Sequence, residues 1–415
     1  MTRSPLCSPA EVSDRVVPVV LGGDILAYSY ARCFHEAFGI ITKVVSAVDV
    51  KVTSSSRFVD YAVEPAIAQG DDAIVRFLAD LGSKLVSDGK IPLLLGSADW
   101  QVRVIVEHEE VLGQWFVVPY NDIALYEDIT QKERFYAICE ELGMAYPRTH
   151  VFSCADPTAD LHAESFDYPL IAKPSNSAQY DLMAFEGKEK IYEVTSPAEL
   201  KRVFGLLCEA GYTAELIVQD FIPGGDDAIY SLTTFSDDTG DVRIVSGGRV
   251  ALQDHSPARI GNPVCIKLER VEQLVEDAKR FCSHVGYRGY ANFDAKYDER
   301  DGRYKFFEVN ARPGANSYYL QVGGVNFARV LVDYFILGKP VEYREAFGDA
   351  VYTLVPARVI KRFVSDLSLR EKVLRAYKDG RAFSPFTCKD DTFAHGLWAY
   401  VRSARQFEKF KRYCA

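Results

Sequence analysis

Residues 289–314 alternate polar and apolar side chains along two short segments that a turn connects. Successive side chains of a β-strand point to opposite faces, so Asn292 and Asp294 share one face of the first segment. Glu308 and Asn310 share one face of the second segment, and the other face of both is apolar. This hairpin constrains the fold strongly, because a sheet with one apolar face must be covered by another layer of secondary structure. Residues 271–285 keep an apolar stripe at helical spacing and predict a helix.

The register of the hairpin decides whether its two polar faces coincide. A two-residue loop would set Asp294 opposite Val309 and join a polar face to an apolar one. A three-residue loop over 300–302, with Gly302 in a left-handed conformation, sets Asp294 opposite Glu308. We therefore predict the three-residue loop.

In this register two carboxylates and an amide oxygen converge within ~5 Å on one face of the sheet. Like charges at that separation repel unless a cation neutralises them, and hard oxygen ligands suit Mg²⁺ that bridges nucleotide phosphates. The alternative is a surface hairpin whose acids are solvated or paired with Lys296 and Arg312. Features elsewhere in the chain favour the metal site.

The first 120 residues alternate strand and helix patterns. Apolar runs at 16–21, 42–48 and 91–95 are typical of buried strands, and residues 27–38 repeat apolar side chains at helical spacing. The order strand, helix, strand predicts a parallel sheet. The turn Gly22-Gly23-Asp24 lacks the G-x-G-x-x-G spacing of dinucleotide-binding folds, which argues against an NAD-dependent oxidoreductase.

The composition is that of an ordinary packed protein and excludes several classes. Hydrophobic residues make up 48% of the 415 residues, and no apolar run approaches the ~20 residues of a membrane span. The nine cysteines show no C-x-x-C spacing, and the net charge of −10 argues against nucleic-acid binding. The first 15 residues lack the apolar core of a signal peptide, so we expect a cytoplasmic protein with a mobile leader.

Two further segments have features of a nucleotide site. Residues 168–177 are an apolar strand that ends on Lys173 and continues into a polar loop, and a lysine at a strand end can reach phosphate oxygens. Residues 216–227 are a strand that breaks at Pro223-Gly224-Gly225 before two acids. Such a break offers unpaired backbone groups to an adenine and carboxylates to ribose hydroxyls.

These features form one ordered set that resembles the ATP-grasp superfamily of carboxylate-amine ligases over roughly residues 120–340. The set consists of Lys132, Lys173-Pro174, Gln219-Asp220-Phe221-Ile222-Pro223-Gly224, Asp294 and Glu308-Val309-Asn310-Ala311-Arg312. Within the superfamily the chain resembles D-aspartate ligases, through residues 18–24, 31–39, 218–224 and 289–294.

The resemblance implies a fold of mixed α/β and α+β class. Two α+β subdomains would hold ATP between them, and a parallel-sheet domain would precede them at the N-terminus. We expect a leader at 1–15, the N-terminal α/β domain at 16–120, the ATP-grasp domain at 121–345 and a basic C-terminal extension at 346–415. Within the ATP-grasp domain we expect a small lid subdomain at about 150–222 and a C-terminal subdomain at about 223–345.

The resemblance also implies a role for each matching residue. The ATP phosphates would be held by Lys132 and Lys173, under a loop that contains Ser175 and Ser177. The adenine would meet backbone groups of Gln219, Asp220, Phe221 and Ile222, and the ribose would meet Asp226 or Asp227. Two Mg²⁺ ions would be bound by Asp294, Glu308 and Asn310. Asn292 stands where related ligases often carry an arginine that contacts phosphate.

The implied reaction forms an amide bond between a carboxylate and an amine at the expense of ATP. The carboxylate attacks the γ-phosphorus, an acyl phosphate forms, and the amine then displaces phosphate. Catalysis would come mainly from positioning and electrostatics, with Arg312 and Lys173 as catalytic residues. Arg259 is our candidate for binding an acidic substrate, and the alternative for it is a solvated loop arginine.

The resemblance further implies that the substrate is D-aspartate and that the acceptor is the lysine side chain of a peptidoglycan precursor. The partners would then be a small-molecule amino acid and a nucleotide-linked or peptide amine acceptor. A ligase that joins other free amino acids or small metabolites is the alternative. A nucleotide-binding domain without catalysis would lack a metal ligand or a phosphate lysine, and this sequence contains all of them.

The segment from Arg358 onward has a basic balance, with 14 Lys and Arg residues against six Asp and Glu residues. One interpretation is a charge-rich, solvated helical face. The other is a surface that attracts an anionic acceptor or an anionic membrane.

If the segment attracts an anionic acceptor, neutralising Lys409, Lys411 and Arg412 should raise the Michaelis constant for that acceptor. Steady-state kinetics at low salt, where surface charges are least screened, measure the effect. An unchanged Michaelis constant would rule the idea out.

Overall fold

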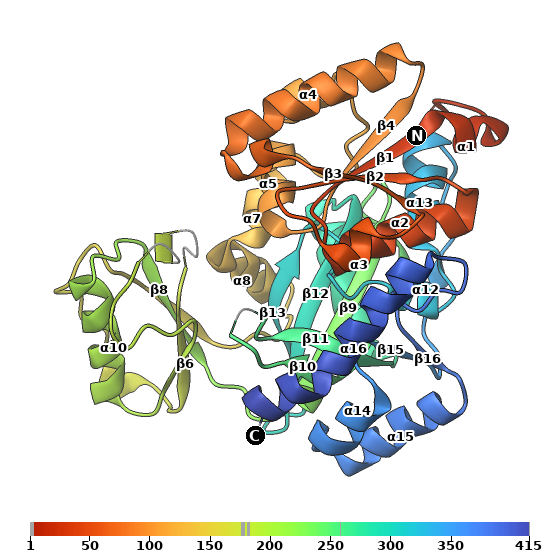
Figure 1. Ribbon diagram of the computed structural model, residues 1–415. Helices are drawn as coiled ribbons and strands as arrows, with labels where there is room; N and C mark the ends of the chain where they lie inside the picture. Colours follow the sequence, from red (N-terminus) through yellow and green to blue (C-terminus); the bar gives the residue numbers. More distant parts are fainter. Residues whose placement is uncertain (1–3, 176–178, 181–182, 258, 415) are drawn as a thin grey trace. The chain divides into compact units, whose positions relative to one another are not determined.

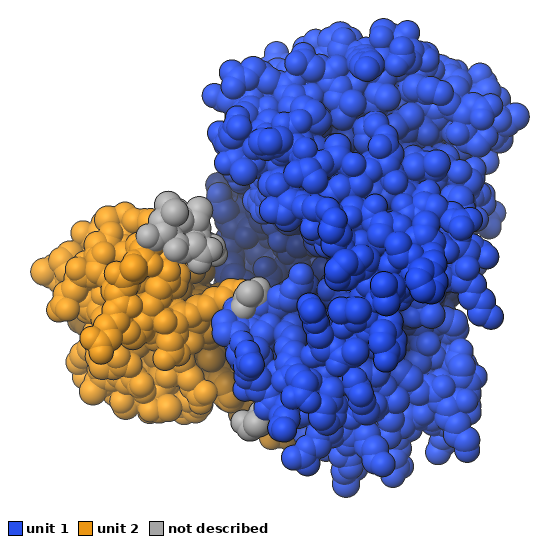
Figure 2. All heavy atoms as spheres, in the orientation of Figure 1, with its two compact units in different colours: residues 1–144, 225–296, 306–415 blue, residues 145–224, 297–305 orange. Residues whose placement is uncertain are grey.

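The computed structural model describes residues 4–175, 179–180, 183–257 and 259–414, which form two compact units. Unit 1 comprises residues 1–144, 225–296 and 306–415, and unit 2 comprises residues 145–224 and 297–305 (Figure 2). Each unit has a hydrophobic core of its own. None of the helices that the structure describes has the length and apolar character needed to cross a membrane.

The N-terminal part of unit 1 contains a parallel sheet with strand order β3-β2-β1-β4 (Figure 1). Its strands are β1 (Val16–Leu21), β2 (Thr42–Ser46), β3 (Val59–Val63) and β4 (Ile91–Gly96). The helices of this part are η1 (Pro9–Glu11), α1 (Val12–Arg15), α2 (Ile25–Phe38), α3 (Lys51–Ser54), η2 (Pro65–Ala68), α4 (Asp71–Ser87), α5 (Asp99–Glu107), α6 (Glu109–Leu112), α7 (Ile123–Thr130) and α8 (Lys132–Glu141).

The predicted parallel sheet is confirmed, since β1, β2 and β4 coincide with the three apolar runs. The edge strand β3 was not predicted, because it is only partly buried and its sequence is not an apolar run. At the end of β1 the chain turns through Gly22, which has φ 97°. A Cβ atom there would lie 2.1 Å from the Ser97 hydroxyl oxygen, so only glycine fits this turn. Asp24 then caps α2 by accepting hydrogen bonds from the N–H groups of Leu26 and Ala27.

The rest of unit 1 is built around an eight-stranded sheet, whose strands follow the order β13-β12-β9-β10-β11-β15-β16 with β14 beside β10. These strands are β9 (Ile229–Ser236), β10 (Val242–Asp254), β11 (Asn262–Leu268), β12 (Gly289–Asp298), β13 (Arg303–Asn310), β14 (Arg344–Glu345), β15 (Val351–Thr353) and β16 (Ala382–Phe383). The helices are η4 (Asp226–Ala228), α11 (Glu272–Val285), α12 (Tyr319–Val322), α13 (Phe327–Leu331), η5 (Val332–Ile336), α14 (Ala357–Phe363), α15 (Leu367–Lys378) and α16 (Phe393–Tyr413).

The predicted hairpin is present as β12 and β13, and its apolar face is covered by a helix. Phe293 of β12 is buried, with its ring in edge contact with Phe281 of α11 and with Phe306 of β13. The predicted helix 271–285 therefore supplies the layer that the hairpin requires.

The turn of the hairpin differs from the prediction, because four residues and not three lie between β12 and β13. Gly302 is left-handed as predicted, with φ 71°, but its N–H donates to the Asp298 carbonyl oxygen at 2.9 Å. The Asp298 carboxylate also accepts hydrogen bonds from the Arg300 guanidinium and from Lys305. These bonds close the turn at Asp298, one residue earlier than the three-residue loop would.

Unit 2 contains an antiparallel sheet with strand order β5-β8-β6-β7 and a small core of its own. Its elements are β5 (Thr149–Ser153), η3 (Ala163–Ser165), β6 (Leu170–Pro174), β7 (Tyr192–Val194), α10 (Pro197–Glu209) and β8 (Glu215–Asp220). The unit covers the range in which we expected the lid subdomain.

The expected mobile leader is wrong in part, because much of it packs on unit 1. The Leu6 N–H donates to the Ile336 carbonyl oxygen at 2.8 Å, and Cys7 and Val12 are buried in the core of unit 1. The prolines and charges that suggested a leader lie on the exposed side of η1 and α1.

The segment expected as a C-terminal extension is also an integral part of unit 1. Residues 351–353 form β15 within the large sheet, and α16 packs on α3 and α14 (Figure 1). Arg32 of α2 donates hydrogen bonds to the carbonyl oxygens of Pro385 and Thr387. The segment packs into unit 1 because its apolar side chains are buried there: Phe386 and Phe410 belong to the same core as α2.

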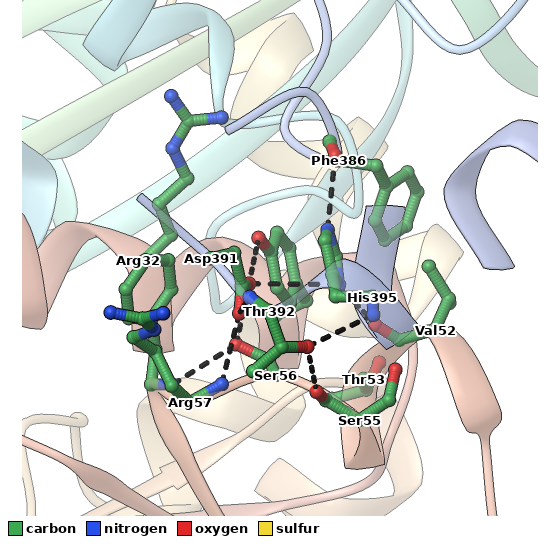
Figure 3. A network of polar contacts seen from close by, with 12 residues as sticks. Arg32, Val52, Thr53, Ser55, Ser56, Arg57, Phe386, Asp391, Thr392 and His395 are labelled. Atoms are coloured by element: carbon green, nitrogen blue, oxygen red, sulfur yellow. Dashed lines mark hydrogen bonds and ion pairs between the residues drawn. The ribbon is translucent and has the colours of Figure 1, made fainter. Parts of the chain in front are cut away.

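A buried polar network fastens this C-terminal segment to the N-terminal part of unit 1 (Figure 3). Asp391 accepts hydrogen bonds from the Tyr28 hydroxyl at 2.9 Å, the Ser56 hydroxyl at 2.7 Å and the Arg57 N–H at 2.9 Å. His395, fully buried, has its two ring nitrogens 2.7 Å from the Val52 carbonyl oxygen and 3.0 Å from the Phe386 carbonyl oxygen. Burial alone would raise the pKa of Asp391, but these hydrogen bonds outweigh it and the pKa is lowered.

We expect Asp391→Asn to reduce the free energy of unfolding at pH 7 by about 2 kcal/mol, because an amide cannot accept all these hydrogen bonds. A carboxyl group with a lowered pKa stabilises the fold above its unfolded pKa of about 3.9 and loses that contribution as the pH falls further. The difference between wild type and variant should therefore shrink below about pH 4. Urea unfolding measures it, and Asp390→Asn at the exposed neighbouring carboxylate is the matched control. Equal losses in the two variants would contradict the prediction.

Candidate functional site

The polar face of β12 lies against hydroxyl-bearing residues of β9. Asn292 pairs with Thr233 and Asp294 pairs with Ser231 in the antiparallel register. The hydroxyls of Ser231, Thr233 and Tyr319 lie within 3.3 Å of Asn292 Oδ1, and Asn292 Nδ2 donates to Asp294 Oδ1 at 3.3 Å. The network holds the side chains of Asn292 and Asp294 in place. Asn292 therefore positions Asp294, a role that the sequence did not indicate.

Asp294 and Glu308 act on each other electrostatically. Burial and, second to it, the charge of Glu308 raise the pKa of Asp294 to about 7. Hydrogen bonds from Ser231 and Asn292 and the charge of Arg312 act in the opposite direction. A second carboxylate beside a buried one is costly without a counter-charge, which is the situation that a bound cation relieves.

The donor set of this face suits Mg²⁺. Within the described ranges, no group of three or more His, Cys, Asp or Glu side chains could hold a metal ion. The set here is instead two carboxylates, Asp294 and Glu308, with Asn310 two residues after Glu308 on the same strand. The charge of Glu308 acts on Asp294, and three oxygen-bearing side chains of this kind fit a hard cation.

Arg312 extends the site beyond the end of β13. Its guanidinium donates from Nη2 to the Asp99 carboxylate at 2.6 Å and from Nη1 to the Pro313 carbonyl oxygen at 2.9 Å. Burial alone would lower the pKa of Arg312, but the Asp99 charge outweighs it and the pKa is raised. Arg312 Nε is buried without a hydrogen-bond partner in the part of the chain that the structure describes. The arginine is thus charged, held from one side, and keeps one donor for a ligand.

The loop after Arg312 packs directly on the polar face of β12. A Cβ atom at Gly314 would lie 2.8 Å from Asn292 Oδ1 and 2.7 Å from Asn316 Oδ1, so glycine permits this approach. Asn316 is buried, and its Nδ2 has no hydrogen-bond partner within the described residues. Sequence reasoning missed Asn316, Asp99 and the hydroxyl row of β9. The row could have been found from Ser231, Thr233 and Thr234, which are polar residues inside a buried strand.

Lys132 lies beside the strand that carries Glu308. Its Nζ donates to the Phe307 carbonyl oxygen at 2.9 Å, and the Tyr136 hydroxyl donates to the same oxygen at 3.0 Å. Lys132 begins α8, which ends before the left-handed Gly143. The structure therefore brings Lys132 next to the predicted metal ligands, and its role toward phosphate stays a prediction.

The two acids expected at the ribose are engaged with β10. Asp226 Oδ2 accepts from the Gln253 N–H at 2.8 Å and lies 2.8 Å from His255 Nε2, and this contact raises the pKa of His255. Asp227 lies 3.6 Å from the Arg249 guanidinium. Either acid would have to share its oxygens with these partners in order to bind a ribose, and that role stays a prediction.

In unit 2 the expected adenine segment has fewer free backbone groups than we predicted. The Asp220 N–H donates to the Arg148 carbonyl oxygen and the Phe221 N–H to the Pro169 carbonyl oxygen, so these two donors are paired. Gln219 is buried and donates from Nε2 to the Thr149 hydroxyl at 2.8 Å. The pairing arises because β8 lies between β5 and β6, so its end is still hydrogen-bonded on both sides.

Other predicted residues of unit 2 lie on or after β6. Lys173 pairs with Ile217 of β8 in the sheet register, and Ile222 is buried after the end of β8. Ser175 donates to the Glu215 carboxylate at 2.7 Å. Ser177 lies outside the residues that the structure describes.

The C-terminal basic residues do not form one free surface. Lys409 is hydrogen-bonded and ion-paired to the buried Asp254, so it is a structural residue and not part of an acceptor surface. Lys411 and Arg412 are exposed at the end of α16, and the acceptor prediction therefore narrows to these two. Arg259 is exposed on the loop between β10 and β11, and the structure does not place it against Arg312.

No protein-family model matches the chain. A D-aspartate ligase from Enterococcus faecium (strain Aus0004) is 32% identical over 413 residues, which are 97% of this chain and 97% of that protein. The chain belongs to the D-aspartate ligase family of ATP-grasp enzymes. It is therefore an ATP-dependent ligase that forms carbon–nitrogen bonds, and such ligases generally use ATP with Mg²⁺.

Solved structures agree with the ATP-grasp fold. An L-amino acid ligase from Bacillus licheniformis matches with a TM-score of 0.55 at 16% identity, over 80% of this chain and 75% of that one. The ADP complex of an N5-carboxyaminoimidazole ribonucleotide synthetase matches with a TM-score of 0.56 at 13% identity, over 82% of this chain and 80% of that one. At these identities the likeness shows the fold, and it confirms the expected ATP-grasp architecture with its N-terminal parallel sheet.

We expect Asp294→Asn and Glu308→Gln each to lower the rate of ADP formation at least about 100-fold, because each removes a carboxylate that would hold the Mg²⁺ by which the charge of the reacting phosphates is neutralised. The change keeps the shape of each side chain, so the fold should be unaffected. ADP release measured by a coupled assay tests this. Glu299→Gln, in the exposed turn of the same hairpin, is the matched control and should retain wild-type rates. Comparable losses in the control would contradict the assignment.

Proposed function

We propose that this ligase joins D-aspartate to the lysine side chain of a peptidoglycan precursor, with an acyl phosphate as intermediate. The observation that carries the proposal is the full-length likeness to the D-aspartate ligase, which includes the C-terminal segment. The polar face of β12 and the unpartnered Arg312 Nε supply a site of matching chemistry. The amino-acid substrate and the amine acceptor are two separate parts of the proposal, and an experiment can test each of them.

In this proposal ATP is bound by the residues that the resemblance to ATP-grasp ligases implies. Lys132 and Lys173 bind phosphate oxygens, Asp226 or Asp227 meets the ribose, and the segment Gln219–Ile222 meets the adenine. The Asp220 and Phe221 N–H groups are paired within unit 2, so neither serves as a free donor to the adenine. Asp294, Glu308 and Asn310 would hold two Mg²⁺ ions, which when bound neutralise the phosphate charges.

The chain's own residues then have distinct tasks in the reaction. Arg312, held by Asp99, donates from its free Nε to an oxygen of the acyl phosphate and so stabilises the charge that develops there. Asn292 and the hydroxyls around it orient Asp294. No side chain needs to act as a nucleophile, because the substrate carboxylate and the acceptor amine supply both nucleophiles.

The test measures ADP release with Mg²⁺ and ATP against D- and L-amino acids, with and without a lysine-containing peptidoglycan precursor. We expect turnover with D-aspartate that depends on the precursor and disappears in Glu308→Gln. The acceptor dependence follows because the amine is required to release phosphate from the acyl phosphate.

Mass spectrometry of the product identifies the new amide bond. Turnover with other amino acids or with a small amine in place of the precursor would support a ligase of other substrates and overturn the proposed pair. ADP release that persists unchanged in Glu308→Gln would show that the activity does not arise at this site.

A further inference from the structure

A cavity of about 280 Å³ lies between α16 and α3, within unit 1. It is lined by Val52 of α3 and by one face of α16, on which Trp398, Arg402 and Arg405 follow one another at helical spacing. Val401 and Gln406 complete the lining. The volume is close to the lower end of ligand pockets, which begin at about 300 Å³, and is sufficient for a group the size of an amino acid.

Arg402 has no counter-ion in this cavity. Its Nε is buried and makes no hydrogen bond, and its guanidinium forms no ion pair within the described residues. The guanidinium lies over the ring of Phe386, whose centroid is 5.0 Å from the guanidinium carbon. Burial lowers the pKa of Arg402, and the nearby charge of Arg259 lowers it further. A guanidinium held in these surroundings is unfavourable unless an anion joins it.

The carboxylates whose charges act on Arg402 already have hydrogen-bond partners elsewhere in the chain. Asp254 and Asp24 are the two acids whose charges act on Arg402. Asp254 pairs with Lys409, which lies about two helical turns after Arg402 on α16. Asp24 accepts the capping hydrogen bonds of α2. The chain thus uses its own carboxylates elsewhere and leaves Arg402 for a ligand.

A second donor without a partner belongs to the same surroundings. Tyr352 of β15 is fully buried, with an exposure of 0%, and its hydroxyl makes no hydrogen bond among the described residues. Arg402 and Asp24 both act on Tyr352 electrostatically. An anion beside Arg402 would be an acceptor of the kind that this hydroxyl lacks.

The cavity also adjoins the turn that leads toward the reaction site. Thr53, next to Val52 in the cavity wall, donates from its hydroxyl to the Gly23 carbonyl oxygen at 2.8 Å. Asp24 follows Gly23, and its charge acts on Arg312 as well as on Arg402. The charge of Asp24 therefore acts on both arginines whose Nε is unpartnered within the described residues.

We propose that Arg402 binds the carboxylate of the acidic amino-acid substrate that does not react, while the reacting carboxylate lies toward Arg312. The inference rests on the proposed function and deepens it by assigning selectivity for a dicarboxylic amino acid to α16. Arg402 is then a specificity-determining residue, and Tyr352 supports it as a hydrogen-bond donor. The predicted cationic partner of the acidic substrate thereby changes from Arg259, which is exposed, to Arg402, whose guanidinium lines a cavity.

The test compares wild type with Arg402→Gln and Arg402→Lys in steady-state ADP release. The amino-acid substrates are D-aspartate and its two monoamides, D-asparagine and D-isoasparagine, one of which keeps the reacting carboxylate. We expect Arg402→Gln to raise the Michaelis constant for D-aspartate roughly 10- to 100-fold, through loss of a charge-assisted hydrogen bond. The constant for ATP should not change, and Arg402→Lys should recover part of the affinity.

The reactive monoamide supplies the decisive comparison. It lacks the carboxylate that Arg402 binds, so its kcat/KM should fall far less in Arg402→Gln than that of D-aspartate. Arg375→Gln, an exposed arginine on α15, is the matched control and should leave both substrates unchanged. Equal losses for D-aspartate and the monoamide, or a change in the Michaelis constant of the acceptor alone, would overturn the proposal.

Failure of the proposed function is recognised separately, from wild-type enzyme that releases no ADP with D-aspartate and any acceptor. In that case calorimetric titration of D-aspartate into wild type and Arg402→Gln decides the site. Binding to wild type that weakens at least about 10-fold in the variant would support the carboxylate site without the ligase assignment. Absent or equal binding would overturn it.

Discussion

The carboxylate of Asp294 beside the charge of Glu308 is the constraint on which the architecture of the site depends. Burial and Glu308 together raise the pKa of Asp294 to about 7. The surroundings are arranged to make such a pair tolerable: Asn292 and Ser231 donate hydrogen bonds, and Arg312 contributes a positive charge. A face that holds negative charge at this cost, and offers an amide oxygen beside it, is suited to a cation and to the phosphates that a cation carries.

The C-terminal segment is built into unit 1. The buried Asp391 network and the Arg32 hydrogen bonds fasten residues 384–395 to the N-terminal part of unit 1, so that α16 lies against α3 (Figure 3). This attachment forms the cavity around Arg402. A segment that looks like a basic appendage in the sequence thus brings a guanidinium close to the turn of Gly23 and Asp24. For binding an acidic substrate, the net charge of +8 in this segment matters less than the position of one arginine without a counter-ion.

Prediction from the sequence succeeded where local pattern decides structure. The apolar runs of β1, β2 and β4, the stripe of α11 and the alternation of β12 and β13 follow from periodicity, which depends only on neighbouring residues. It failed where side-chain contacts that periodicity does not report decide the structure. Asp298 closes the hairpin turn with Arg300 and Lys305, and burial of Cys7 and Val12 holds the segment expected as a leader. Polar residues in β9 were overlooked because their partner, Asn292, lies about 60 residues away.

By itself the sequence determined the type of chemistry. The ordered set of Lys132, Lys173, Asp294, Glu308 and Asn310 resembles that of the ATP-grasp ligases, and the resemblance implies a reaction in which these residues hold ATP and Mg²⁺. The tertiary structure alone decided which charges are compensated. Lys409 is neutralised by Asp254, whereas Arg402, seven residues earlier on the same helix, is left without a carboxylate. The physical reason is that desolvation and ion pairing depend on what lies within a few ångströms in space, and linear sequence does not specify that distance.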